Sequence, residues 1–283
     1  MAHILPHDSA AAVDRGADNW WMRVLFDKIT APTPRVAAQA TTPDATPLAL
    51  AVDSYAVPPH RDRWVRAVMV TTLDGAATGW DGLSGSINTA ADHVVFTACR
   101  VLADAVVVGA GTVRAEGYSP LSLDGEAAAM RRADGRPEPL TLVVVSNSGK
   151  LPDKVINGAS HNTPVIAVIP AASDERRHLQ DRLGTAQVIV AGDTKVDLPD
   201  AFEQLSQHSL RRIAAEGGPS LLADLLSARL IDELALTLSP KVVGGLHPRI
   251  SHGPDLALEF TPRLLLEHDG TLMGRWLRTA DLG

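Results

Sequence analysis

Short, continuously apolar segments alternate with amphipathic ones from Trp64 onward, and this alternation limits the folds open to the chain more than any other feature. Apolar character on consecutive residues is typical of strands that helices cover on both faces. The intervening helical patterns then supply the crossover connections of a mainly parallel sheet. The strands predicted in this way are 64–70, 105–109, 140–145, 164–169, 187–190, 211–216 and 233–238.

Helical spacing of apolar residues predicts the connecting helices, and a turn signal predicts a terminal hairpin. Asn88 and Thr89 are suited to capping a helix over 89–103. Asp269-Gly270 lies between two strand-like segments, which is a strong hairpin signal. The sequence therefore predicts antiparallel strands at one edge of the sheet. The further helices are predicted at 173–183, 198–208 and 218–229, and the hairpin strands at 263–268 and 272–278.

Residues 1–62 differ from the rest because prolines are frequent there, and we predict an extension separate from a domain at 63–283. Apolar residues at helical spacing predict one short helix over 18–29. Two interpretations of the extension remain open. It is either laid over the main body or a partner subunit, or it is a partly disordered arm.

Charge and cysteine content exclude several classes of function. The formal net charge is −7, which argues against general binding to nucleic acid or to anionic membranes. Cys99 is the single cysteine, so a cysteine-based zinc site is excluded, and no metal site is predicted. No apolar run approaches the roughly 18 residues of a spanning helix. These observations favour a cytoplasmic enzyme that acts on a small molecule.

Two glycine-containing turns follow predicted strands, where ligands of open α/β sheets bind. The first, 109–114, begins like a dinucleotide fingerprint but has Arg114 in place of the third glycine. The second, 216–220, has paired glycines and Pro219 before a predicted helix, whose N-terminus would suit a pyrophosphate. Either turn alone is more simply a tight strand-to-helix connection. Together they predict a nucleotide site, provided that both loops converge on it.

The motifs TTLDGAAT, SGSI, LADAVVVGAGTVRAEGY and AAEGGPSLLADLLSARLIDELALTLSPKVVGG occur in this order. This set resembles the reductase domain of the bacterial riboflavin biosynthesis deaminase–reductase, from about Trp64 to the end of the sequence. The resemblance implies a dihydrofolate-reductase-like α/β fold, with a mainly parallel sheet flanked by helices. Family members that include the deaminase half have a Pro-Cys-x-x-Cys zinc motif. A chain with one cysteine therefore resembles a stand-alone pyrimidine reductase.

The resemblance also implies a reaction, in which NADPH delivers a hydride to the ribosyl carbon of 5-amino-6-ribosylaminouracil 5′-phosphate. Glu116 occupies the place of a family aspartate and is the candidate catalytic residue. A homodimer is implied as well. The positions that match substrate-binding residues are Ser84, Arg100, Leu121 and Glu216. Those that match cofactor-binding residues are Thr71, Ser86, Gly109, Gly111, Thr112, Val113, Ser146, Gly217, Gly218, Pro219, Ser220 and Leu221.

Departures from the family pattern concern positive charge. Val68 replaces a lysine that family members often have, and a substrate-side arginine has no clear equivalent. The candidates to replace these cations are Arg63, Arg66 and Arg131, and those to bind a cofactor 2′-phosphate are Arg114 and Lys150. Charge-assisted contacts bind phosphates most strongly, so the loss of these cations weakens the expected binding of a substrate phosphate. Two alternatives to the implied reaction therefore stay open. The chain could reduce dihydrofolate, a pteridine, or it could bind NADPH without catalysis.

Overall fold

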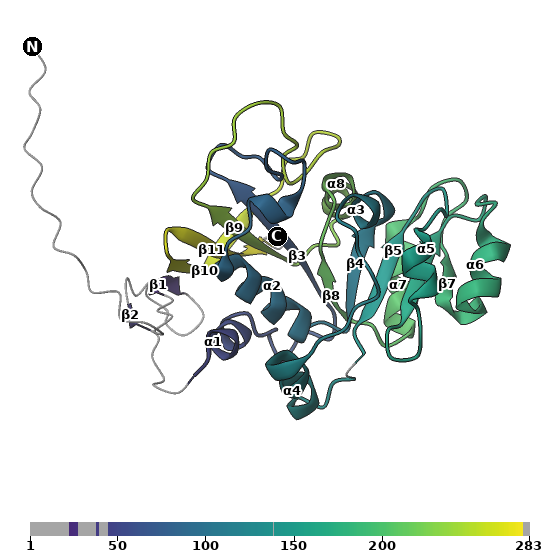
Figure 1. The fold of residues 1–283 in the computed structure, drawn as a ribbon, viewed down its shortest axis with the longest axis horizontal. Coiled ribbons are helices and arrows are strands. Elements are labelled where there is room, and N and C mark those ends of the chain that lie inside the picture. Colours follow the sequence, from purple (N-terminus) through teal and green to yellow (C-terminus); the bar gives the residue numbers. More distant parts are fainter. Residues whose placement is uncertain (1–22, 28–37, 40–44, 138, 280–283) are drawn as a thin grey trace, which may run out of the picture.

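The computed structural model describes residues 23–27, 38–39, 45–137 and 139–279. Its centre is a sheet in the order β2-β1-β10-β11-β9-β3-β8-β4-β5-β6-β7 (Figure 1). The strands are β1 (Arg23–Asp27), β2 (Ala38–Gln39), β3 (Trp64–Thr72), β4 (Ala105–Gly109), β5 (Thr141–Val145), β6 (Val165–Ile169), β7 (Val188–Val190), β8 (Arg212–Ala215), β9 (Glu233–Ser239), β10 (Phe260–His268) and β11 (Thr271–Arg278).

Within the sheet, the neighbouring strands of the series β9-β3-β8-β4-β5-β6-β7 pair in parallel. The remaining pairings, among β2, β1, β10, β11 and β9, are antiparallel. This arrangement confirms the predicted fold class, a mainly parallel sheet with an antiparallel C-terminal hairpin. All nine strands predicted from the sequence are present, with shifts of up to three residues at their ends. The hairpin, however, does not lie at the edge of the sheet, because β1 pairs with β10 and β2 pairs with β1.

Helices cover both faces of this sheet. The α-helices are α1 (Pro47–Ser54), α2 (Ala90–Val101), α3 (Ala110–Ala115), α4 (Gly125–Ala133), α5 (Asp153–Asn157), α6 (Arg176–Leu183), α7 (Leu198–Gln207) and α8 (Pro219–Ser227). Two short 3₁₀ turns are present at Ser84–Ser86 and Thr185–Gln187. Four of the five helices predicted from the sequence correspond to α2, α6, α7 and α8, whereas α1, α3, α4 and α5 were not predicted.

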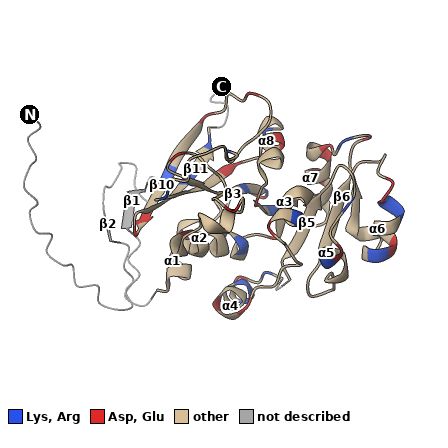
Figure 2. Cartoon of the chain, turned by 45° about the horizontal axis from the view of Figure 1, so that its top comes forward, with Lys and Arg blue, Asp and Glu red and all other residues tan. Residues whose placement is uncertain are grey.

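Alternate residues of the central strands belong to different cores, as buried strands require. Val106 and Val108 pack with apolar residues of α1 and α2 on one face. Ala105 and Val107 pack with residues of α7 and α8 on the other face. A further cluster beneath α6 contains Leu179. Acidic and basic residues are interspersed along outer helices such as α6 (Figure 2). None of the described helices is long and apolar enough to span a membrane.

The helix predicted over 18–29 is wrong at 23–27, where the structure has strand β1. Short apolar segments fit a helix or a strand about equally well. Here the free edge of β10 decides, because Arg23–Asp27 pairs with it in antiparallel register. Residues 18–22, 28 and 29 lie outside the described part of the chain.

The proline-rich segment also contributes a helix that joins the core. Thr46 caps α1 by accepting a hydrogen bond from the Ala49 N–H at 3.1 Å, and Pro47 occupies the first turn, where it needs no donor. Ala51 and Tyr55 are fully buried in the core that α2 shares. The division of the chain at residue 62 stays a prediction.

Candidate active site

The two glycine-containing turns lie next to each other at the carboxyl ends of β4 and β8. These strands pair in parallel, and the Gly109 N–H donates to the Gly217 carbonyl oxygen at 2.9 Å. Helix α3 begins after the first turn and α8 after the second, and neither helix has a side-chain N-cap. The two loops therefore meet at one place, as predicted for a nucleotide site.

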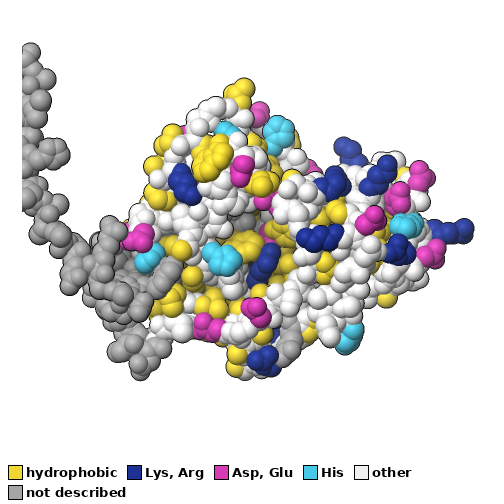
Figure 3. All heavy atoms as spheres, in the orientation of Figure 1, with side chains coloured by type: hydrophobic (Ala, Val, Ile, Leu, Met, Phe, Trp, Pro, Cys, Tyr) yellow, Lys and Arg dark blue, Asp and Glu magenta, His cyan; other side chains and the backbone are white. Residues whose placement is uncertain are grey.

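A cleft with a volume of about 370 Å³ opens beside these turns. Figure 3 shows the molecule hollowed near the middle of this face, with hydrophobic side chains in the depression. Gly111 and Thr112 of α3, together with Gly218 and Pro219 of α8, line one part of it. Residues from β3, from α2 and from the segment just before α2 line another part, among them Val68, Val70, Asn88, Asp92, His93 and Phe96.

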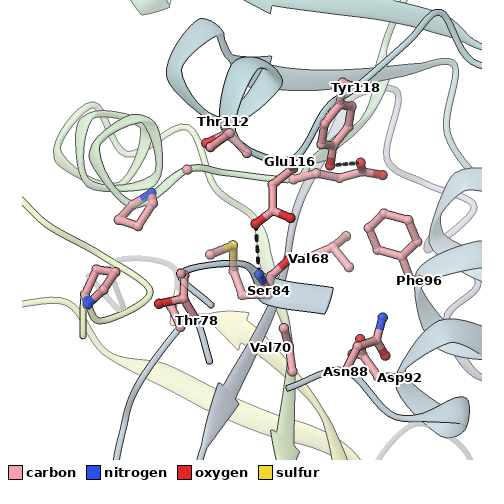
Figure 4. Close-up of a pocket in the computed structure, with 18 of the residues that line it drawn as sticks. Val68, Val70, Thr78, Ser84, Asn88, Asp92, Phe96, Thr112, Glu116 and Tyr118 are labelled. Carbon is pink, nitrogen blue, oxygen red and sulfur yellow. Dashed lines mark hydrogen bonds between the residues drawn. The ribbon is translucent and has the colours of Figure 1, made fainter. Parts of the chain in front are cut away.

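Glu116 projects into the middle of the cleft, where Figure 4 shows it above Ser84. It ends α3, and Gly117 follows with a positive φ of 69°, which lets the chain turn sharply away. One carboxylate oxygen of Glu116 accepts the Ser84 N–H at 2.9 Å. This bond fixes the side chain from across the cleft, while its second oxygen accepts no hydrogen bond from the described part of the chain and is available to a ligand.

Glu216, at the end of β8, is held by two other side chains. The Arg100 guanidinium donates to both carboxylate oxygens, at 2.6 and 2.7 Å, and the Tyr118 hydroxyl donates to one of them at 2.8 Å. Burial and the negative charge of Glu216 raise the pKa of Tyr118 well above its usual value, so the phenol stays a donor. The Arg100 guanidinium also lies 4.2 Å from the centre of the Phe96 ring.

Seven of the seventeen site residues predicted from the sequence lie together in the lining of the cleft. Glu116, Ser84, Glu216, Gly111, Thr112, Gly218 and Pro219 line the cleft, and Arg100 contacts it through Glu216. Ser146 is buried at the end of β5, the strand next to β4. Thr71, Ser86 and Leu121 do not line the cleft. Instead, the Thr71 hydroxyl donates to the Ala76 carbonyl and the Ser86 hydroxyl to Asp81, while Leu121 is in the core.

Two of the three arginines that could replace the missing cations instead bind partners away from the cleft. Arg66 is buried against Glu233, at 2.7 Å, and Arg131 donates to the main-chain carbonyls of Val101 and Ala103. Neither residue lines the cleft. The basic groups beside the cleft include Arg100, which contacts it through Glu216, and His93, which lines it. The Lys241 ammonium donates to the carbonyls of Ser86 and Asn88. Within the described ranges, no cluster of three His, Cys, Asp or Glu side chains could hold a metal.

The sequence patterns do not indicate that several further residues line the cleft, namely Thr78, Asn88, Asp92, His93, Phe96, Tyr118 and Pro248. Asp92 and Phe96 were read only as parts of a helix. Their spacing of four residues places them on one helix face, but nothing in a single sequence says that this face meets a cleft.

Comparison with known proteins decides the family. The sequence model of the RibD C-terminal domain matches residues 63–272. The chain belongs to this family. It is 33% identical, over 62% of its length and 76% of the relative, to 2,5-diamino-6-ribosylamino-4(3H)-pyrimidinone 5′-phosphate reductase of Methanothermobacter thermautotrophicus. The enzyme of the same name from Archaeoglobus fulgidus is 29% identical over 62% of the chain and 80% of the relative.

A solved structure is also similar to this RibD C-terminal domain protein. It is a pyrimidine reductase-like protein from Corynebacterium diphtheriae, with a TM-score of 0.71 and 25% identity, covering 84% of this chain and all of the other. The family indicates an oxidoreductase with a nicotinamide nucleotide cofactor. The residues present fit such a group, because two uncapped helix N-termini meet at the cleft and a Cβ at Gly111 would meet nothing within 4 Å.

Proposed function

We propose that the protein is an NADPH-dependent reductase of a ribosylaminopyrimidine 5′-phosphate in riboflavin biosynthesis. One observation carries the proposal: the turns at 109–116 and 216–220 meet at a single cleft that also holds Glu116. The curated relatives are named for reduction of the 2,5-diamino-pyrimidinone form of this substrate. The sequence resemblance points to the uracil form, so both belong to the proposed substrate class.

The cofactor, when bound, supplies a hydride. This hydride would add to C1′ of the ribosyl group, the bond from C1′ to the ring oxygen would break, and that oxygen would take a proton. Holding two reactants at near-attack distance is the main task of the protein in such a step. The loops that begin α3 and α8 would hold the cofactor phosphates. The apolar wall of Val68, Val70 and Phe96 would hold the heterocycle.

Glu116 is suited to the proton transfer in this scheme. It lies in the cleft at the end of α3, and the Ser84 N–H fixes one of its oxygens. A carboxyl group positioned in this way can deliver a proton to the departing ring oxygen, which is general acid catalysis. Glu216 is less suited, since Arg100 and Tyr118 already occupy its oxygens.

Steady-state oxidation of NADPH tests the function directly. The purified protein is incubated with each ribosylaminopyrimidine phosphate and, separately, with dihydrofolate. We expect turnover with a pyrimidine and none with dihydrofolate. Turnover of dihydrofolate alone would replace this proposal with the folate alternative. Tight NADPH binding without turnover of any of the three would indicate a silent cofactor-binding protein.

The preference for NADPH over NADH is a separate prediction that rests on two exposed cations. The Arg114 guanidinium on α3 donates to the Lys150 main-chain carbonyl oxygen at 3.2 Å, so the Arg114 side chain reaches the loop after β5 that contains Lys150. We expect Arg114→Ala combined with Lys150→Ala to raise the KM for NADPH about tenfold, because charge-assisted contacts to a phosphate contribute roughly 1.5–3 kcal/mol. The KM for NADH should stay unchanged. A double variant with wild-type preference would contradict this assignment.

A homodimer, which the family resemblance implies, and a cytoplasmic location, which was predicted from charge and cysteine content, complete the proposal. Sedimentation equilibrium of the full chain measures the first. A monomer at micromolar concentration would contradict it. The location is measured by fractionation of cells that express the full chain.

A further inference from the structure

The N-terminal end of α2 places two unusual polar groups in the cleft. Asp92 lines it, although only 6% of this residue is exposed. Asn88 lines it as well, and its buried side-chain oxygen has no hydrogen-bond partner among the described residues. Figure 4 shows the two side chains together, on the same side of the cleft as Phe96. A buried polar atom without a partner is costly, so this oxygen marks a place where a ligand would bind.

The carboxylate of Asp92 is not needed to cap helix α2. The Thr89 hydroxyl caps α2 by accepting the Asp92 N–H at 3.2 Å, so the cap does not need the carboxylate. The carboxylate accepts one hydrogen bond, from the side chain of Thr237 on β9. Burial raises the pKa of Asp92 to about 6, while Thr237 and His93 act in the opposite direction. A ligand whose N–H groups donate to the Asp92 carboxylate would compensate the energetic cost of burying it.

Glu216, another buried acid of the cleft, already has hydrogen-bond donors that compensate its negative charge. Arg100 and Tyr118 donate to Glu216, whereas β3 contributes only the uncharged Val68, Met69 and Val70 to the cleft. Asp92 and the Asn88 oxygen are therefore two acceptors beside an apolar wall suited to a planar ring. Such a pair calls for a heterocycle with adjacent N–H donors on one edge.

We propose that Asp92, with Asn88 beside it, binds the N3–H and 2-amino edge of the pyrimidine, and that this contact makes the protein prefer a 2-amino-4-pyrimidinone over a uracil. This inference rests on the proposed function and names its substrate more closely. The N3–H and one N–H of the 2-amino group are parallel donors that match two carboxylate oxygens, as arginine does. A uracil instead presents its 2-oxo oxygen to the carboxylate, which repels it.

The test compares 2,5-diamino-6-ribosylamino-4(3H)-pyrimidinone 5′-phosphate with its 2-oxo counterpart. Both kcat/KM and calorimetric Kd in the presence of NADP⁺ are measured for the wild type and for Asp92→Asn. We expect the wild type to prefer the 2-amino compound at least tenfold. Asp92→Asn should lose about 10- to 100-fold on that compound and less than threefold on the uracil, the range expected of a hydrogen bond to a charged group.

Two further variants make the test specific. Asp181→Asn, an exposed change on α6, should alter neither value, and Asn88→Ala should reduce the preference about threefold to tenfold. Equal losses of Asp92→Asn on both compounds, or no loss at all, would overturn the inference. Binding separates it from the proposed function. A wild type that binds the 2-amino compound preferentially without reducing it would refute the reductase and keep the assignment of Asp92, whereas a wild type without this preference would refute the assignment.

Discussion

Glu116→Gln should lower kcat at least 100-fold while the Kd for NADPH stays within about twofold of the wild type. A glutamine keeps the carbonyl oxygen that accepts the Ser84 N–H, so the side chain should stay in place. It has no proton to deliver at the ring oxygen, and general acid catalysis contributes typically 10²- to 10⁴-fold. Stopped-flow measurement of hydride transfer and fluorescence titration of NADPH give the two values.

Glu203→Gln is the matched control for this experiment, since Glu203 is exposed on α7, away from the cleft lining. It should leave both values unchanged. A variant at Glu116 that keeps more than a tenth of the wild-type kcat would show that the proton comes from another group. Loss of NADPH binding would instead make Glu116 part of the cofactor site.

The largest effect on stability is expected at Glu233, which is fully buried at the start of β9. It accepts hydrogen bonds from Arg66, at 2.7 Å, from Trp64 and from Arg275. Burial alone would raise the pKa of Glu233, but the two arginines outweigh burial and lower it. Glu233→Gln leaves two buried guanidinium groups without a negative partner.

Breaking a buried ion pair from one side costs about 3–5 kcal/mol. For a chain of this size, that loss in the free energy of unfolding lowers the Tm by roughly 6–20 °C. Asp134→Asn is the control, because the Asp134 side chain is 61% exposed and its partner Arg136 keeps a second carboxylate, Asp104, at 3.0 Å. Calorimetric scans of both variants compare the two changes. Similar Tm values would mean that the cluster at Glu233 contributes no more than a surface pair.

The strands of the sheet could be predicted from the sequence because a strand buried on both faces has a continuous run of apolar residues. Runs such as 105–109 and 165–169 have no polar residue, and a strand between two helical layers requires this. The meeting of the two glycine turns could also be predicted, since parallel neighbours end at the same edge. The strand β1 could not be predicted in this way, because its partner β10 lies more than 200 residues away in the sequence.

At the candidate site, the sequence predicted the residues of the loops that follow strands better than the residues of α2 and β3 that line the cleft. Glu116, Thr112 and Gly218 follow strands within motifs, so their place could be inferred. Asp92 resembled an ordinary polar residue in the first turn of a helix, and its place in a cleft depends on how α2 packs on β3. Arg66 was considered as a phosphate ligand, but its partner Glu233 is 167 positions away, and no local pattern reveals such a pair.

The contribution of residues 45–56 to the core has a practical consequence. The guanidinium of Arg66 donates to the Tyr55 carbonyl, and that of Arg275 donates to the carbonyls of Ser54 and Ala56. A protein trimmed to the segment that the family shares, from residue 63, would lose these acceptors together with the strand that pairs with β10. The exposed backbone of β10 would then offer a template for self-association. Recombinant work on this protein should therefore retain the proline-rich region.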